Sequence, residues 1–450
     1  YYNGFIPFCV YTTYFTLPIL MIISLISIWA SLAIALVVLF SAVHFWFKHS
    51  DFEVDTSPLD YYPMITVVVP AHNEDVVISQ TAQAILDLNY PHDRVEIILF
   101  ADNCSDNTYQ EMKKVKARPQ NAGRDLTLID RTGTGGKAGV LNDALKMAKG
   151  EYICVYDADA MPEKNALYFL VKKVMENPER HVASFGRNKT RNANQNFLTR
   201  CINQEIVVTQ RIQHVGMWHL GKIGRIPGTN FIINTAFVKS IGGWRNGALT
   251  EDTDISFKIM QSGKLIALAH NSEAFQQEPE TLRSYYLQRK RWAKGNYEVV
   301  IANFKHLFGR GNWRVKWEVF YYACTFFWFN AAIVLSDILF FINVAALIFG
   351  LFKPGVTVPF AFNADNIYMA QLLLFNWLLM ILLYLLQISI SLATQHGQAT
   401  VKQIWIALLA YFTYTQLFII VSISSVCSVI MDKILRREGT KWVKTKRFAG

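Results

Sequence analysis

Two aspartates separated by one residue are the first chemical signal in this sequence. Asp157 and Asp159 come after residues 152–156, a short apolar run typical of a buried strand. At the end of a strand, both carboxylates can face one hard cation, as Mg²⁺ or Mn²⁺ requires when substrate phosphates complete its coordination. Aspartate is also a common helix-capping residue, so the pair alone equally fits a turn. The place after a buried strand favours a metal site, with Asp157 and Asp159 as ligands.

A glycine-rich segment that carries one lysine is the second signal. Residues 133–139 contain four glycines around Lys137. Glycines let backbone amides approach a phosphate closely, and the lysine adds positive charge. The segment is not a P-loop, because the closing Gly-Lys-Ser/Thr of that motif is absent, and this disfavours a nucleoside triphosphatase. The alternative interpretation is a plain flexible loop.

Polar residues also follow two other apolar runs. Asn73 and Glu74 come after the run 65–69, and Asp102 comes after the run 96–100. A carboxylate at the position of Asp102 can accept a hydrogen bond from a base or a ribose. An Asx turn with a helix cap is the alternative.

Three carboxylates crowd into four residues farther along the chain. Glu251, Asp252 and Asp254 open an amphipathic run, so helix capping accounts for part of the pattern. Three acids exceed what a cap needs. Such crowding raises the pKa of a carboxylate and makes it a usable general base. Asp252 and Glu251 are therefore the candidate catalytic residues.

Basic and aromatic side chains alternate between residues 283 and 294. Nucleic-acid binding is one use of this pattern, but an apolar block follows, which favours a helix at a membrane interface. We expect no nucleic acid as a partner. Within the stretch, Arg291 and Trp292 are suited to a diphosphate and to the face of a sugar, respectively.

Strand and helix patterns alternate around these residues. The pattern predicts strands at 65–69, 96–100, 126–129 and 152–156, with Pro70 stopping the first, and helices near 77–86, 108–115 and 138–148. Such alternation predicts a doubly wound α/β sheet. Because ligands bind at the carboxyl ends of its strands, the polar residues after each run are expected to share one site.

The composition adds a membrane to this picture. Of the 450 residues, 52% are hydrophobic and only 17% are charged, against about 25% charged in soluble domains. No Asp, Glu, Lys or Arg occurs from Phe5 to Phe47, a length sufficient for two crossings. Three more apolar blocks cover 319–352, 368–393 and 404–431. The net charge of +10 by itself suits anionic lipids, nucleic acids or phosphorylated small molecules.

Basic residues set the expected topology. Lys305, Arg314 and Lys316 precede the first C-terminal block, and a basic tail follows the last one. The positive-inside rule places both in the cytoplasm. The number of C-terminal crossings is then even. We expect four, with the block 319–352 folded as a hairpin of two helices; the alternative is that one block lies in the membrane interface.

Together these residues resemble the membrane-embedded processive glycosyltransferases of family 2, which include cellulose, hyaluronan, chitin-oligosaccharide and poly-N-acetylglucosamine synthases. The resemblance runs from about Met64 to Gly295. Six motifs occur in order, although His72 stands where the family usually has an aromatic residue. The order of the apolar blocks is most similar to that of poly-N-acetylglucosamine and hyaluronan synthases.

The resemblance implies a role for each motif. Asn73 and Glu74 match the nucleotide motif of the first strand, Asp102 the aspartate at the uracil, and Lys137 the lysine loop at the nucleotide. Asp157 and Asp159 match the motif for the metal and the diphosphate, and Glu251 and Asp252 match the TED motif, whose aspartate is the general base. Gln288, Arg291 and Trp292 match QxxRW, which closes over the diphosphate and helps form the acceptor site. Residues 228–231 would lie near the acceptor sugar, without an assigned role.

The fold that follows is an α/β, Rossmann-like nucleotide-sugar-binding domain of the GT-A type in the cytosol, joined to an α-helical transmembrane bundle. The expected parts are N-terminal transmembrane helices in 1–47, the cytosolic glycosyltransferase domain in 48–300, an interfacial basic segment in 301–317, C-terminal transmembrane helices in 318–432 and a basic cytosolic tail in 433–450.

The implied activity is inverting, processive polymerisation of a β-linked polysaccharide from a UDP-sugar, UDP-GlcNAc favoured, with Mg²⁺ or Mn²⁺ as cofactor. The polymer leaves through a channel formed by the protein's own helices. Expected partners are the growing polysaccharide and the lipid bilayer of the plasma membrane. An accessory membrane protein is a further candidate partner. The alternative is a non-processive enzyme that adds one sugar to a lipid or glycan. A transporter or receptor is disfavoured, because the C-terminal apolar blocks carry almost no charge.

Overall fold

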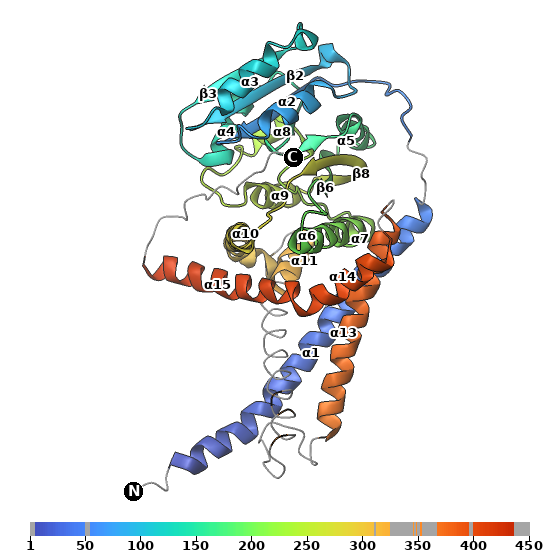
Figure 1. Cartoon of the computed structure of the whole chain (residues 1–450), viewed down its shortest axis with the longest axis vertical. Helices are drawn as coiled ribbons and strands as arrows, with labels where there is room; N and C mark the ends of the chain where they lie inside the picture. Colours follow the sequence, from blue (N-terminus) through green and yellow to red (C-terminus); the bar gives the residue numbers. More distant parts are fainter. Residues whose placement is uncertain are drawn as a thin grey trace.

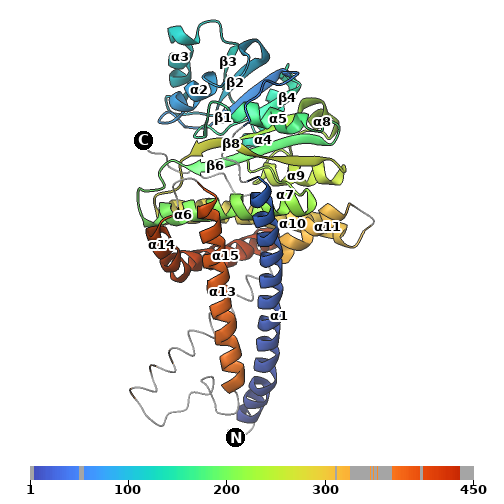
Figure 2. The same ribbon diagram turned by 90° about the vertical axis from the view of Figure 1, so that its right-hand side faces the viewer.

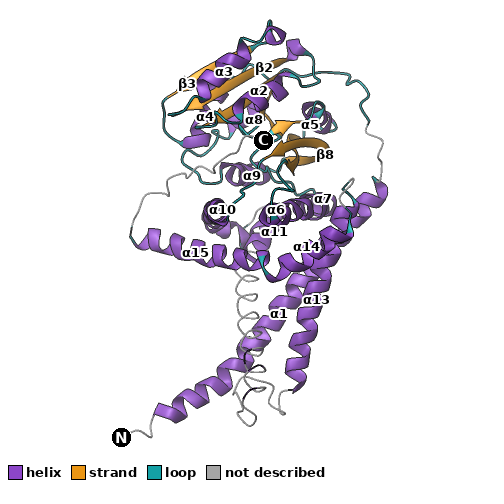
Figure 3. Ribbon diagram, viewed as in Figure 1, coloured by secondary structure: helices purple, strands orange, loops and turns teal. Residues whose placement is uncertain are grey.

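An α/β domain sits at one end of a helical stalk (Figure 1). The computed structural model describes residues 5–49, 55–309, 312–324, 367–395 and 399–435, and three single positions between 345 and 352. The strands form one layer with helices on both sides (Figure 3). The hairpin expected in 319–352 lies largely outside the described residues, and so does the basic tail beyond residue 435.

The secondary structure comprises eight strands and a larger number of helices within the described residues. The strands are β1 Ile65–Ala71, β2 Val95–Asp102, β3 Leu126–Arg131, β4 Tyr152–Val155, β5 Met161–Pro162, β6 His181–Thr190, β7 Phe231–Asn234 and β8 Leu265–Gln276. The helices are α1 Phe5–Lys48, α2 Ile78–Leu86, α3 Thr108–Lys116, α4 Gly136–Met147, α5 Ala166–Met175, α6 Phe197–Val208, α7 Val215–Gly221, α8 Thr235–Ser240, α9 Glu251–Gln261, α10 Leu282–Asn303, α11 Trp313–Ala323, α13 Ile367–Ala393, α14 Val401–Phe412 and α15 Tyr414–Ile434. A π-helix, Thr209–His214, joins α6 to α7.

The four predicted strands and three predicted helices are confirmed as β1 to β4 and α2 to α4. The prediction that Pro70 ends the first strand is wrong, because β1 continues to Ala71. The carbonyl oxygen of Val68 points toward β4 and accepts a hydrogen bond from the backbone N–H of Tyr156, the residue after β4. Backbone groups two residues apart in a strand point to the same side, so the nitrogen of Pro70 also faces β4, which has already ended at Val155. Its missing N–H thus costs no sheet hydrogen bond.

The predicted strands form the fully parallel half of the sheet, and the other half is mixed. The strand order of the sheet is β3-β2-β1-β4-β7-β6-β8-β5. The first four strands are parallel, whereas β7 is antiparallel to both β4 and β6, and β5 is antiparallel to β8. β6 and β8 pair in parallel, with irregular register at two points of β6. The second half of the sheet therefore bends away from the regular first half.

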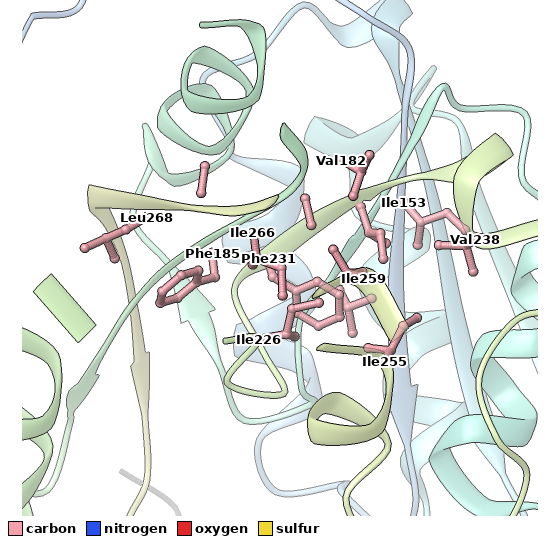
Figure 4. Packing of buried hydrophobic residues seen from close by; sticks show 14 of the residues in the cluster. Ile153, Val182, Phe185, Ile226, Phe231, Val238, Ile255, Ile259, Ile266 and Leu268 are labelled. Atoms are coloured by element: carbon pink, nitrogen blue, oxygen red, sulfur yellow. The ribbon is translucent and has the colours of Figure 1, made fainter. Parts of the chain in front are cut away.

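Two apolar clusters, one on each face of the sheet, form the core. The first joins α2, α3 and α5 to one face of the strands. The second joins α4 and α9 to the other face and includes Phe185, Phe231 and Ile259 (Figure 4). Burial on both faces explains why β1, β2 and β4 read as continuous apolar runs.

The N-terminal apolar segment forms one helix rather than the expected two. α1 is continuous over 44 residues. At its carboxyl end, Leu39, Ala42 and Phe45 join the second apolar cluster of the α/β domain. There α1 crosses α7 closely, because Gly216 has no side chain to meet the carbonyl of Val38. The expected domain boundary between 47 and 48 therefore does not coincide with a break in packing, because the end of α1 shares a core with the α/β domain.

The C-terminal helices take two directions. α13 runs beside α1 along the stalk, whereas α14 and α15 run across the base of the α/β domain (Figures 1 and 2). The third apolar block is thus broken at Thr413 into two helices. In the part of the chain that the structure describes, three segments are long and apolar enough to cross a membrane, Leu25–Lys48, Phe375–Ala393 and Val401–Asp432. The boundary expected between 317 and 318 falls inside α11, whose Val315 and Val319 are buried.

Candidate active site

A cavity of about 560 Å³ opens where the parallel strands end. It lies between the loops after β1, β2 and β4, the start of α4, and helices α9 and α10. The structure brings ten of the eleven candidate site residues to its wall. These are Glu74, Asp102, Lys137, Asp157, Asp159, Glu251, Asp252, Gln288, Arg291 and Trp292.

Asn73 is the candidate that does not line the cavity. Its side-chain oxygen accepts a hydrogen bond from the backbone N–H of Ser105, at 2.7 Å, and its own N–H donates to the sulfur of Cys104. It adopts a positive φ of 56°, which asparagine tolerates better than most residues. Asn73 thus joins the loops after β1 and β2 and positions its neighbour Glu74.

An arginine that the sequence analysis missed holds Asp102. The guanidinium of Arg131 lies 2.5 Å from Asp102 Oδ1 and 2.9 Å from Asp143 Oδ2. Arg131 ends β3, and the register pairs it with Asp102 at the end of β2. Its place at a strand end was the signal available in the sequence. Asp102 therefore lines the cavity with its Oδ1 already paired with Arg131.

Lys137 lies at the meeting point of three elements. Its ammonium group is 2.5 Å from Asp157 Oδ1, 2.7 Å from the carbonyl oxygen of Gly228 and 3.4 Å from Glu251 Oε1. Asp157 and Glu251 together raise the pKa of Lys137 above its usual value despite burial. Lys137 therefore stays protonated and offers a fixed positive charge to an anion in the cavity.

The loop before β7 supports this charge cluster, a role that no motif indicated. Besides the Gly228 carbonyl on Lys137, the hydroxyl of Thr229 accepts a hydrogen bond from the backbone N–H of Asp157 at 2.9 Å. Gly228 has a φ of +87°, and a Cβ on it would lie 3.0 Å from Asp252 Oδ2. A glycine is therefore required beside Asp252.

Asp252 and Asp254 face opposite ways, although only one residue separates them. Burial, and then the charge of Glu251, raises the pKa of Asp252 to about 7. A carboxylate with this pKa is suited to accept a proton near neutral pH. Asp254 instead lies 3.3 Å from Arg245 and 3.5 Å from Lys258, outside the cavity.

Asp157 and Asp159 fit a hard cation that takes further ligands from a substrate. Within the described residues, no group of three or more His, Cys, Asp or Glu side chains surrounds one point. Two carboxylates supply only oxygen ligands, which Mg²⁺ and Mn²⁺ prefer, and leave positions for phosphate oxygens. Both side chains line the same cavity.

A second cavity, of about 280 Å³, lies on the other side of Asp252. It is bounded by α6, the π-helix, α9, α10 and α11, on the side of the domain that faces the stalk. Fifteen of its 21 lining residues are polar or charged. Five residues line both cavities: Pro227, Thr250, Asp252, Gln276 and Trp292.

Comparison with known proteins identifies the family. The family described as "Glycosyltransferase like family 2" matches residues 63–295. The probable glycosyltransferase YdaM of Bacillus subtilis is 34% identical over 396 residues, which cover 86% of this chain and 87% of that protein. The chain belongs to glycosyltransferase family 2, and it is an enzyme that uses a nucleotide sugar.

More distant relatives differ in what they make. Poly-beta-1,6-N-acetyl-D-glucosamine synthase of Staphylococcus aureus is 27% identical over 271 residues, 58% of this chain and 63% of that protein. Beta-monoglucosyldiacylglycerol synthase of Trichormus variabilis is also 27% identical, over 59% of this chain and 56% of that protein. The chain thus spans less than two thirds of the length of either relative.

A solved structure shares the fold. The mannosyltransferase PcManGT of Pyrobaculum calidifontis, in complex with GDP-Man and Mn²⁺, aligns with a TM-score of 0.55 at 18% identity. The alignment covers 88% of this chain and 99% of that one. The α/β domain is therefore GT-A-like.

We expect Gly228→Ala to lower sugar transfer strongly and Gly123→Ala to leave it unchanged. Both glycines have positive φ, +87° at Gly228 and +79° at Gly123, so alanine at either position destabilises the fold by about 1–2 kcal/mol. Only at Gly228 does the new Cβ meet Asp252; nothing lies within 4 Å at Gly123. Incorporation of labelled sugar and the midpoint of thermal unfolding, measured on both variants, test this. Equal transfer by the two would show that the contact does not matter.

Proposed function

We propose that this protein is an inverting, processive glycosyltransferase that builds a β-linked polysaccharide from a UDP-sugar, with UDP-GlcNAc favoured. The observation that carries the proposal is the position of Asp252. Its half-buried carboxylate lines both a cavity suited to a nucleotide sugar and a second cavity suited to an acceptor. A base between donor and acceptor is what a single in-line displacement requires.

The donor cavity stabilises a leaving diphosphate. Lys137 and Arg291 line it, and each can bind phosphate oxygens. Asp157 and Asp159 would hold a Mg²⁺ or Mn²⁺ ion, which would supply further positive charge for the diphosphate. Asp102, oriented by Arg131, is placed to accept a hydrogen bond from the base at the far end.

Asp252 activates the acceptor. It accepts the proton of an acceptor hydroxyl as that oxygen attacks the anomeric carbon from the side opposite to the diphosphate. One displacement turns an α-linked donor into a β-linked product. Trp292, which lines both cavities, offers an indole face on which a sugar ring can stack.

The polar side chains around the second cavity favour a glycan over a diacylglycerol as acceptor. Asn188, Gln210 and Glu278 are among its lining residues, and such groups match sugar hydroxyls. A diacylglycerol headgroup offers one hydroxyl and two apolar chains. Transfer of a single sugar to a lipid, the alternative, would leave a buried polar atom such as Asn188 Oδ1 without a partner among the described residues, at a cost of about 1–3 kcal/mol.

The proposal includes a membrane location. α1 and α13 lie side by side along the stalk and contain two of the three sufficiently apolar segments. We place the α/β domain in the cytoplasm, where UDP-sugars are made, in a multi-pass protein of the plasma membrane. The polymer would leave through a channel between the protein's own helices. The second cavity, on the stalk side of Asp252, is the place from which such a path would begin.

With labelled UDP-GlcNAc and Mn²⁺ or Mg²⁺, we expect the purified protein to form a product of many sugars. A polar acceptor cavity can hold the end of a chain after each transfer, so elongation should continue. Gel filtration and digestion with linkage-specific hydrolases measure product length and bond type. A single sugar on an extractable lipid would support the alternative. Use of another UDP-sugar would change only the donor.

Two conservative substitutions should separate the base from the metal ligand. Asp252→Asn keeps shape but cannot accept a proton, so we expect transfer to fall about 10²- to 10⁴-fold while UDP still binds. Asp159→Asn removes a cation ligand, so UDP binding and transfer should fall together. Calorimetric titration with UDP and Mn²⁺, beside an incorporation assay, measures both effects. Near-normal transfer by Asp252→Asn would assign the base to another residue.

The pH profile should follow the ionisation of Asp252. The base must be ionised, so kcat/KM should rise with pH through about 7, the pKa of Asp252. Glu251→Gln removes a neighbouring negative charge that raises this pKa, so the rise should move to lower pH. Asp254→Asn is the control, because Asp254 pairs with Arg245 and Lys258 outside the cavity. A rise at the same pH in Glu251→Gln would contradict the assignment.

A further inference from the structure

Arg289 points into a different cavity from its neighbours in the sequence. Gln288 and Arg291 line the donor cavity, whereas Arg289 lines the second cavity and Trp292 lines both. Successive residues of a helix are turned by about 100°, so α10 presents these side chains to both cavities. The pattern that suggested a role for Gln288, Arg291 and Trp292 left Arg289 without one.

Three helices hold the Arg289 side chain in place. Its Nη1 donates to Glu205 Oε1 on α6 at 2.8 Å, and Glu205 Oε2 accepts a hydrogen bond from the hydroxyl of Tyr414 on α15. The guanidinium lies 4.6 Å from the ring centre of Trp292 and 5.3 Å from that of Tyr285. The arginine is therefore fixed beside the indole on which we place the acceptor sugar.

Two nitrogen atoms of this arginine lack partners among the described residues. Arg289 Nε and Nη2 are buried and form no hydrogen bond with any residue that the structure describes. In the same cavity, Asn188 Oδ1 and Glu318 Oε2 are likewise buried and without a hydrogen bond inside the described part of the chain. Buried polar atoms are costly to leave unpaired. Donors and acceptors around one cavity match a ligand whose hydroxyls both donate and accept.

The charges around the cavity favour an uncharged ligand. Its wall carries four carboxylates, on Glu205, Asp252, Glu278 and Glu318, against the guanidinium groups of Arg225 and Arg289. Each arginine is already paired with one carboxylate, Arg225 with Glu318 and Arg289 with Glu205. A sugar that bears a carboxylate would meet net negative charge in a partly buried space, where repulsion is weakly screened.

We propose that Arg289 binds the acceptor sugar through Nε and Nη2, and that Glu205, by neutralising it, makes the cavity select an uncharged acceptor over a uronate-bearing one. The assignment rests on the proposed function, since it needs a glycan acceptor in the second cavity. It adds a binding residue and names the chemical class of the acceptor.

The first test measures acceptor binding. With UDP-GlcNAc as donor and chitotriose as acceptor, Arg289→Gln should raise the acceptor KM about tenfold or more, as for the loss of a charged hydrogen bond. The Kd for UDP should stay within about twofold. Arg289→Lys, which keeps the charge but not the planar set of donors, should raise KM less. Arg283→Gln, an exposed arginine on the same helix, is the matched control and should behave like wild type.

The second test measures acceptor charge. Wild-type protein should prefer chitotriose to a trisaccharide ending in glucuronate. Glu205→Gln removes the carboxylate that neutralises Arg289, so the positive charge of Arg289 can then attract the glucuronate and the preference should fall about tenfold. Tyr414→Phe removes the hydroxyl that donates to Glu205 but keeps the charges of Glu205 and Arg289, so the preference of this variant should not change. Thermal unfolding of each variant separates these effects from loss of fold.

The outcomes separate the two proposals. An unchanged acceptor KM in folded Arg289→Gln, or an unchanged preference in folded Glu205→Gln, would overturn the assignment of Arg289. Polymerisation by the wild-type protein would still support the proposed function in that case. If Arg289→Gln did not fold, the KM of Arg289→Lys would decide in its place. Wild-type protein that released UDP but elongated neither probe would refute the proposed function itself.

Discussion

The site is organised around one cation, the ammonium group of Lys137. Its partners are Asp157 after β4, the Gly228 carbonyl before β7 and Glu251 at the start of α9. These elements belong to the parallel and the antiparallel halves of the sheet, so the lysine joins both halves at the cavity. Without it, several carboxylates would repel one another in a partly buried space. The same charge holds the pKa of Asp252 below the value that burial and Glu251 alone would give.

The second constraint is that one helix serves two cavities. α10 presents Gln288 and Arg291 to the first cavity and Arg289 to the second, and Trp292 lines both. The helix is linked to α15, because Lys294 lies 2.5 Å from Asp432. A helix that crosses the base of the α/β domain thus contacts the helix that lines both cavities.

The elements that sequence predicts well are those with a continuous local pattern. Strands β1, β2 and β4 are buried on both faces, and their runs of apolar residues are unmistakable, whereas β3 at the edge of the sheet is mostly half-buried. β6 was missed because it contains Arg187 and Lys189, whose charges are paired by residues distant in sequence, Glu273 on β8 for both and Glu163 for Lys189. α1 was expected as two helices because a long uncharged stretch contains nothing that distinguishes one long helix from a hairpin.

The order of residues along the chain already shows which acids, glycines and basic residues follow which strands, and their resemblance to family 2 motifs indicates a nucleotide sugar. Which of these residues lie together is set by the packing of distant elements. Asp252 and Asp254 are alike in sequence, yet one enters the cavity and the other pairs with Arg245. Arg131 acquires its role from the register between β2 and β3. The physical reason is that a side chain's direction and its distant neighbours are set by packing between elements, which the order of residues along the chain does not record.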